Sequence, residues 1–229
     1  MDIAANLARI RTEIATTCAR CGRDPATVRL IAVSKTHPAS AVAVACAAGQ
    51  ILFGESYVQE FLAKAEAVQL PVAWHFIGHL QSNKVRYLPG KVALIHSLDR
   101  LTLAEEISRQ WGKHGLQAEV LIEVNLGGEA GKSGVREVEL EALLRRVVTL
   151  PHLAVRGLMT LPPYLDDPAA VRPYFRRLRE LARRLDTLDL PGLSMAELSM
   201  GMSHDFTVAI EEGATLVRIG TAIFGERSG

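Results

Sequence analysis

Apolar and polar positions along the chain form blocks that predict strands and helices in regular succession. The run 28–33 is apolar except for Arg29, a pattern typical of a short strand buried on both faces in a parallel sheet. Ahead of it, residues 2 to about 21 carry apolar side chains at three- and four-residue spacings, which predicts an amphipathic N-terminal helix. The chain therefore opens with a helix and then a buried strand.

The same alternation of strand and helix continues to the end of the chain. The eight predicted strands are 28–33, 51–54, 73–78, 92–96, 120–125, 153–159, 193–200 and 215–220. The helical segments expected after them are 39–48, 56–68, 80–88, 99–114, 136–149, 168–187, a short helix near 205 and a last turn.

Strict β/α alternation predicts a parallel sheet. Eight units match a (β/α)8 TIM barrel over about 28–226, with one extra helix in front. A doubly wound open sheet is the alternative, because alternation alone does not establish closure. No linker or low-complexity tract divides residues 1–229, so we expect a single domain.

Composition and charge narrow the class of protein. Apolar residues make up 48% of the chain and charged residues 22%, with a net charge of +1. These values are those of an ordinary globular protein and indicate no nucleic-acid partner. No apolar run is long enough to span a bilayer, and the N-terminus lacks the pattern of a signal peptide, so we expect a cytoplasmic protein without membrane contact.

Several motifs resemble known sites without completing them. Cys18 and Cys21 have C-x-x-C spacing, but no second pair or nearby histidines accompany them, and none of the seven histidines forms an H-E-x-x-H pair; we expect no metal site. The segment 127–133 ends in Gly-Lys-Ser, yet Leu126 stands where a nucleotide-binding P-loop needs its first glycine. The arginines of 172–184 have helical spacing, which favours the solvated face of an outer helix over a polyanion-binding surface.

Chemistry in a parallel α/β fold belongs at the carboxyl ends of the strands. Lys35 follows the first strand there, and an amine that loses hydration can act as a nucleophile toward carbonyls. An ordinary lysine that ends a strand is the simpler alternative. The other strand ends supply further candidates for a binding pocket, which are Ser56, His75, Met159, Ser199 and Met202.

The last two strands lead into loops where barrels often bind phosphate. Ser203 supplies a hydroxyl from one loop, and Gly220 and Thr221 supply backbone N–H groups and a second hydroxyl from the other. Ordinary helix capping by Ser203 and Thr221 is the alternative. Arg218 lies in an apolar strand, where a guanidinium needs a partner or a ligand. Together with Lys35, these residues indicate a phosphorylated carbonyl compound such as pyridoxal 5′-phosphate (PLP), with Arg218 facing its ring nitrogen.

Seven motifs, in order and covering about 29–226, resemble the pyridoxal phosphate homeostasis protein family. They are Ala32–Thr36, Phe53–Glu60, Trp74–Lys84, Lys132–Gly134, Arg156–Met159, Leu198–Ser203 and Val217–Gly225. The resemblance implies a barrel like the N-terminal domain of alanine racemase, a fold-type III PLP-binding barrel without the C-terminal β-domain. It implies PLP bound covalently to Lys35, phosphate contacts from Ser203, Gly220 and Thr221, and Arg218 near the pyridine nitrogen. The family usually has asparagine at the position of Ser56, so any contact made by that asparagine is in doubt here.

Members of the family are regarded as carriers or regulators of free PLP that affect amino-acid and keto-acid balance. We expect the same of this chain: a monomer that binds PLP, passes it to apo-enzymes and has no catalytic residues. Racemisation needs a base on each face of the substrate, and the sequence ends after the eighth unit, leaving nothing for the domain that supplies the second base. A small PLP-dependent racemase-like enzyme and a Schiff-base aldolase without cofactor are the alternatives.

Overall fold

The structure is a computed structural model that describes residues 2–129, 131 and 133–226. Its strands are β1 (Arg29–Val33), β2 (Leu52–Glu55), β3 (Ala73–Phe76), β4 (Leu94–Leu98), β5 (Ala118–Asn125), β6 (Val135–Arg136), β7 (Leu153–Met159), β8 (Leu193–Ser199) and β9 (Leu216–Ile219). Its α-helices are α1 (Ile3–Arg20), α2 (Ala39–Ala47), α3 (Val58–Ala67), α4 (Leu101–Gly112), α5 (Glu137–Val147), α6 (Arg172–Asp186), α7 (Phe206–Glu211) and α8 (Thr221–Phe224). Three 3₁₀ segments are η1 (Pro25–Thr27), η2 (Ser82–Tyr87) and η3 (Pro168–Val171).

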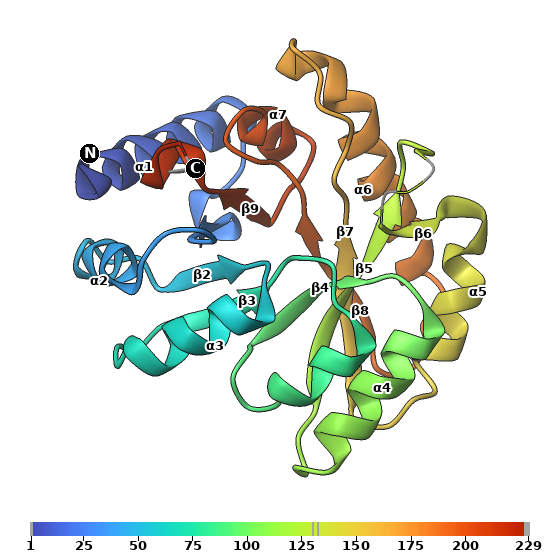
Figure 1. Cartoon of the computed structure of the whole chain (residues 1–229). Coiled ribbons are helices and arrows are strands. Elements are labelled where there is room, and N and C mark those ends of the chain that lie inside the picture. Colours follow the sequence, from blue (N-terminus) through green and yellow to red (C-terminus); the bar gives the residue numbers. More distant parts are fainter. Residues whose placement is uncertain (1, 130, 132, 227–229) are drawn as a thin grey trace.

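The strands close into a parallel barrel surrounded by helices (Figure 1). The strand order is β4-β3-β2-β1-β9-β8-β7-β5-β6, and β4 also pairs with β5, which closes the ring. At the seam between the first and last strands, Ile31 pairs with Arg218 and Ala32 with Ile219. The predicted (β/α)8 barrel is confirmed, and the open doubly wound sheet is wrong.

The short β6 lies outside the ring, and among the described residues it pairs with the end of β5 alone. The sequence did not predict this strand, because a two-residue bridge leaves no periodic pattern. The predicted strand 92–96 is displaced to Leu94–Leu98, and the helix predicted over 80–88 is the 3₁₀ segment η2. Ala130 and Lys132, which belong to the segments compared above with a P-loop and with the family, lie outside the described residues.

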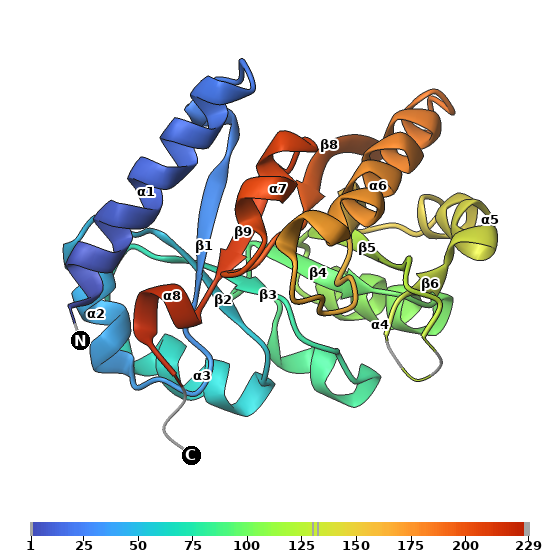
Figure 2. The same ribbon diagram turned by 90° about the horizontal axis from the view of Figure 1, so that it is seen from above.

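The extra N-terminal helix completes the outer layer. Figure 2 shows α1 beside α8. Because α8 has only four residues, α1 lies where a barrel would otherwise have a longer outer helix. Its apolar face buries Leu7, Ile10 and Ile14, and the Asn6 side chain donates a hydrogen bond to the Ile223 carbonyl at 3.0 Å. Burial of this face stabilises α1 against the barrel, so the first and last elements of the chain pack together.

Inside the ring, an apolar layer supports a polar one. Ile31, Leu94, Leu121, Met159 and Leu216 form a buried cluster within the barrel. Two residues further along β4, β5 and β9 the side chains are polar, namely His96, Glu123 and Arg218. Successive inward positions lie two residues apart along a strand, so this switch from apolar to polar places functional groups above a packed floor.

Candidate functional site

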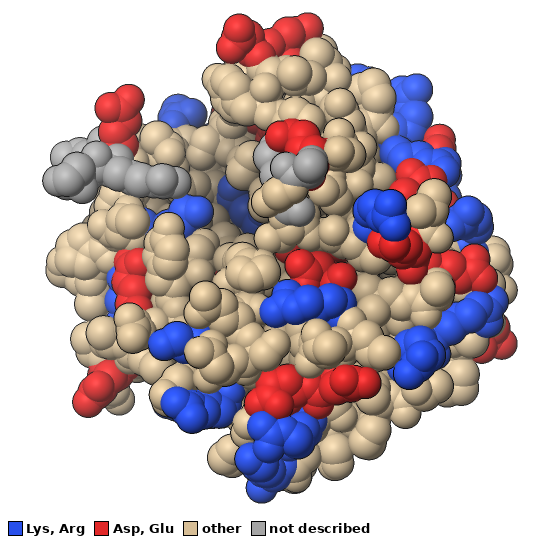
Figure 3. Space-filling model, turned by 45° about the vertical axis from the view of Figure 1, so that its right-hand side comes forward, with Lys and Arg blue, Asp and Glu red and all other residues tan. Residues whose placement is uncertain are grey.

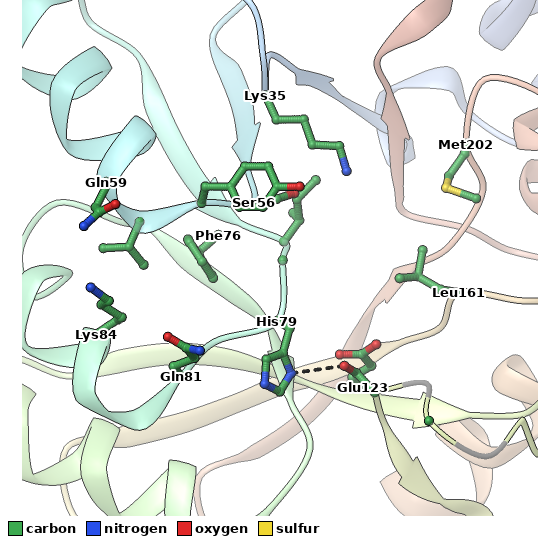
Figure 4. Close-up of a pocket in the computed structure, with 16 residues that line it drawn as sticks. Lys35, Ser56, Gln59, Phe76, His79, Gln81, Lys84, Glu123, Leu161 and Met202 are labelled. Carbon is green, nitrogen blue, oxygen red and sulfur yellow. Dashed lines mark hydrogen bonds between the residues drawn. The ribbon is translucent and has the colours of Figure 1, made fainter. Parts of the chain in front are cut away.

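Lys35 lies at a cavity of about 850 Å³ at the carboxyl ends of the strands. Figure 4 shows its side chain reaching into this space from the end of β1, with the nitrogen between Ser56 and Met202. Ser56 follows β2 and Met202 follows β8, so three strands supply these walls. Of the ten residues predicted to bind a cofactor, these three line the cavity.

The opposite end of the same cavity is formed by α3 and η2. Figure 4 shows Gln59, Gln81 and Lys84 there, away from Met202. His79 and Ser133 also line the cavity, and the His79 Nδ1 and the Ser133 hydroxyl are hydrogen-bonded at 3.1 Å. A cavity of this volume is within the range that holds small molecules of cofactor size.

The two loops predicted to bind phosphate lie side by side. The backbone N–H of Ala222, in the first turn of α8, donates to the Ser203 hydroxyl at 3.3 Å. This bond is the capping role that the sequence left open for Ser203, so phosphate binding by Ser203 and Thr221 stays a prediction. A Cβ built on Gly220 would lie 3.2 Å from the Val33 carbonyl oxygen, which shows how closely this loop approaches the end of β1.

Arg218, Ser199 and His75 belong to one buried hydrogen-bonded chain beneath the cavity. Arg218 donates to the Ser199 hydroxyl and, at 3.0 Å, to the Thr160 carbonyl. The Ser199 hydroxyl is 2.8 Å from His96 Nδ1, and His96 Nε2 is 3.0 Å from His75 Nδ1. The sequence placed His75 nearer a pocket than His96, but the structure buries both.

Burial sets the protonation of this chain. It lowers the pKa of His75 to about 4 and, with His75 nearby, that of His96 well below its ordinary value. Burial also lowers the pKa of Arg218 to about 10, which leaves the guanidinium charged at neutral pH. Because Ser199 accepts from Arg218, its own hydrogen is available for donation to Nδ1 of the neutral His96.

Glu123 is a functional candidate that the sequence analysis missed. It lines the cavity from β5 yet is only 4% exposed. Burial, reinforced by nearby Asp99 and opposed by Arg218, raises the pKa of its carboxyl group to about 7. The available signal was a charged residue within the apolar strand Val120–Val124, the same signal that marked Arg218.

The donor groups fit a phosphorylated aldehyde such as PLP. A primary amine enters the cavity, two hydroxyls and a glycine backbone lie on neighbouring loops, and a charged guanidinium lies below.

No group of three or more potential metal ligands occurs among residues 2–129, 131 and 133–226. Cys18 and Cys21 are free thiols, one buried and one exposed. Within the same residues, every helix is too short or too polar to cross a membrane.

Four of the six arginines of α6 are engaged in ion pairs, namely Arg172, Arg176, Arg177 and Arg179. Arg172 binds Glu211 and Glu212, and Arg177 binds Glu137. Figure 3 shows basic and acidic side chains interspersed over one face of the molecule. The pattern is that of a solvated helix most of whose arginines are paired, as the sequence favoured.

The fold and site define a class of protein, the alanine racemase N-terminal domain, whose sequence profile matches residues 5–228. Alanine racemase from Corynebacterium glutamicum shares this fold, with a TM-score of 0.68 at 19% identity. The match covers 96% of this chain and 61% of that one.

Within this class, the chain belongs to the pyridoxal phosphate homeostasis protein family. It is 50% identical to that protein from Aquifex aeolicus over 228 residues, 99% of each chain, and 49% identical to that of Pseudomonas aeruginosa, over 98% and 96% of the two. The structure of PipY from Synechococcus elongatus with PLP bound superimposes with a TM-score of 0.86 at 38% identity, covering 97% of this chain and all of that one.

Proposed function

We propose that this protein binds PLP, holds it covalently on Lys35 and releases it to acceptors, and so acts in PLP homeostasis. The observation that carries the proposal is the Lys35 amine in a cavity beside the paired loops of Ser203 and Gly220. The PLP-bound structure of PipY and the names of the relatives support the same ligand. This exchange is proposed to occur in the cytoplasm and to affect amino-acid and keto-acid balance.

Each predicted residue has a role in this proposal. Bound PLP supplies an aldehyde that reacts reversibly with amines. Lys35 provides the amine, and Ser203, Gly220 and Thr221 hold the phosphate. Ser56 and Met202 form the cavity walls. Arg218 would donate a hydrogen bond to the ring nitrogen and is itself hydrogen-bonded to Ser199. Deeper in the barrel, His75 belongs to the buried hydrogen-bonded chain and Met159 to the apolar cluster below it.

Arg218 favours holding the cofactor over catalysis with it. A charged guanidinium donates hydrogen bonds, so it opposes protonation of the ring nitrogen that would strengthen electron withdrawal. Its pKa, lowered by burial only to about 10, keeps it charged throughout the physiological range. We therefore propose that the protein is a non-catalytic carrier. We further propose that it is monomeric and that its partners are apo-enzymes that require PLP.

Transfer of the cofactor tests this proposal. Protein loaded with PLP is incubated with an apo-enzyme, and recovery of the enzyme's activity is followed. We expect activation, and a yellow protein whose colour depends on Lys35. A colourless protein that forms an imine with sugar phosphates would instead support the cofactor-free aldolase.

A parallel incubation with amino acids in D₂O separates carrier from enzyme. We expect no α-proton exchange above that caused by free PLP. Exchange that disappears in Glu123→Gln would support the racemase-like alternative, because Glu123 is a buried carboxyl group lining the cavity whose pKa burial raises to about 7.

A further inference from the structure

A second lysine lies buried behind the turn that carries Lys35. Lys64 is on α3, and its side chain is only 5% exposed. The ammonium group donates to Glu55 Oε1 at 2.8 Å, to Glu60 Oε1 at 2.6 Å and to the Ser34 carbonyl at 2.5 Å. All three of its donors are therefore used within the protein.

The same network holds the backbone on both sides of Lys35. The Ser34 hydroxyl donates to Glu55 Oε1 at 2.6 Å, and the Thr36 backbone N–H donates to Glu60 Oε1 at 2.5 Å. Ser34 and Thr36 are the immediate neighbours of Lys35. The residue that carries the amine is thus fixed to β2 through Glu55 and to α3 through Glu60 and Lys64.

The turn needs such support. Thr36 has a φ of 67°, in the left-handed region that a β-branched residue rarely adopts. Strained residues of this kind persist only when the surroundings hold them, and they concentrate at functional sites. The hydrogen bond from the Thr36 N–H to Glu60 supplies that restraint at the strained residue itself.

Stability alone does not account for this network. Burying an ion pair such as Lys64–Glu55 often gives no more stability than apolar packing of the same volume. Burial raises the pKa of Glu55, against the opposing effect of Lys64 and Ser34. Glu55 Oε2 is buried without a hydrogen-bond partner among the described residues. What the network does provide is hydrogen bonds to Ser34 and Thr36, which fix the backbone on both sides of Lys35.

We propose that Lys64, Glu55 and Glu60 are positioning residues that hold the Lys35 turn so that its amine enters the cavity ready for covalent bonding. The inference rests on the proposed function, since Lys35 is taken as the residue that binds PLP. Fixing a reacting group in advance speeds the covalent step without strengthening the other contacts of the ligand. The network therefore affects bond formation at Lys35 and leaves phosphate binding unchanged.

Lys64→Met tests this separation, because methionine fills a similar volume without charge. The rate of covalent bonding is followed by absorbance and by borohydride trapping with added PLP. Non-covalent binding is followed as the Kd of pyridoxamine 5′-phosphate, which lacks the aldehyde. We expect the covalent rate constant to fall on the order of tenfold to a hundredfold, and the Kd to stay within about twofold. An unchanged rate, or equal losses in both quantities, would overturn the proposal.

Glu60 provides a matched pair of variants and a second route should Lys64→Met not fold. Glu60→Gln retains an oxygen that accepts from Thr36, so it should keep most of the covalent rate. Glu60→Leu removes the acceptor and should lose it. Equal behaviour of the two variants would contradict the positioning role. Lys113→Met removes an exposed lysine after α4 and serves as the control for charge.

Amide hydrogen exchange gives a readout without PLP. In cofactor-free protein, the Thr36 amide should exchange slowly and should lose protection in Lys64→Met and Glu60→Leu. Absence of covalent PLP on wild-type Lys35 would refute the proposed function even with this protection intact. Unchanged Thr36 protection in both variants would refute the positioning network even with PLP bound normally.

Discussion

Arg218 shows how a single buried charge organises the base of the site. Its guanidinium is held by Ser199 and the Thr160 carbonyl, and two neutral histidines extend the hydrogen-bonded chain across the barrel. A buried cation in such a chain is stable only while its partners remain, because an unpaired buried charge is costly. The residues of this chain are therefore expected to act as a unit.

Ser199→Ala tests that unit. It removes one of the two acceptors of Arg218 and the partner of His96 Nδ1, so we expect the free energy of unfolding to fall by about 1–3 kcal/mol. Urea denaturation provides the measurement, with the exposed Ser40→Ala as control, for which a change within about 0.5 kcal/mol is expected. A loss no larger than that of the control would show that the chain contributes nothing to stability.

The raised pKa of Glu123 predicts that the stability of the protein depends on pH. Burial raises its pKa from 4.5 to about 7, so the folded protein binds its proton more tightly than the unfolded chain does. This contribution is complete below pH 4.5 and is lost as the pH rises from 4.5 to 7; it amounts to at most about 3 kcal/mol. Glu123→Gln should remove it, so the difference in unfolding free energy between variant and wild type should grow from pH 5 to pH 8. Parallel pH profiles would contradict the assignment.

At the scale of elements, the loop between β9 and α8 is set against the end of β1. Gly220 allows this approach because a side chain there would press on the Val33 carbonyl. Lys35 is only two residues beyond Val33, so the proposed phosphate loop and the residue that carries the amine lie close together at the end of β1. Displacing the loop should therefore affect phosphate recognition without removing the amine.

Gly220→Ala provides that displacement. We expect affinity for PLP to fall on the order of tenfold, equivalent to about 1.4 kcal/mol, while covalent bonding of pyridoxal, which has no phosphate, stays unchanged. The ratio of the two affinities is the internal control. Equal weakening of PLP and pyridoxal would show that the substitution disturbs Lys35 and not a phosphate site.

Sequence patterns predicted the elements more completely than the contacts between them. The run 28–33 marked a buried strand and its end marked Lys35, because burial and strand termination are local properties. The structure confirmed the barrel, while β6 was missed as a bridge too short for periodicity. Lys64 carried no local signal, since a charged side chain on a helix ordinarily faces solvent. Glu55 stands at the end of β2, where a polar residue is equally ordinary, so its burial was not predicted either.

At the scale of the whole molecule, closure of the barrel brings distant residues together. The partners His96 and Ser199 are 103 positions apart, and the partners Lys64 and Ser34 are 30 apart. Such pairs depend on the order of strands around the ring, which alternation alone did not determine. Converging strand ends place the amine at a cavity, the buried arginine beneath it and the paired loops against the end of β1.

The central claim is that Lys35 binds PLP covalently and reversibly. The most direct measurement is the absorbance spectrum of the purified protein with PLP before and after borohydride reduction, followed by peptide mapping. The account predicts a visible absorbance band that reduction removes, with the modification on the peptide containing Lys35, and loss of the band in Lys35→Ala. A band that persists in Lys35→Ala, or a modification mapped only to another lysine, would contradict it.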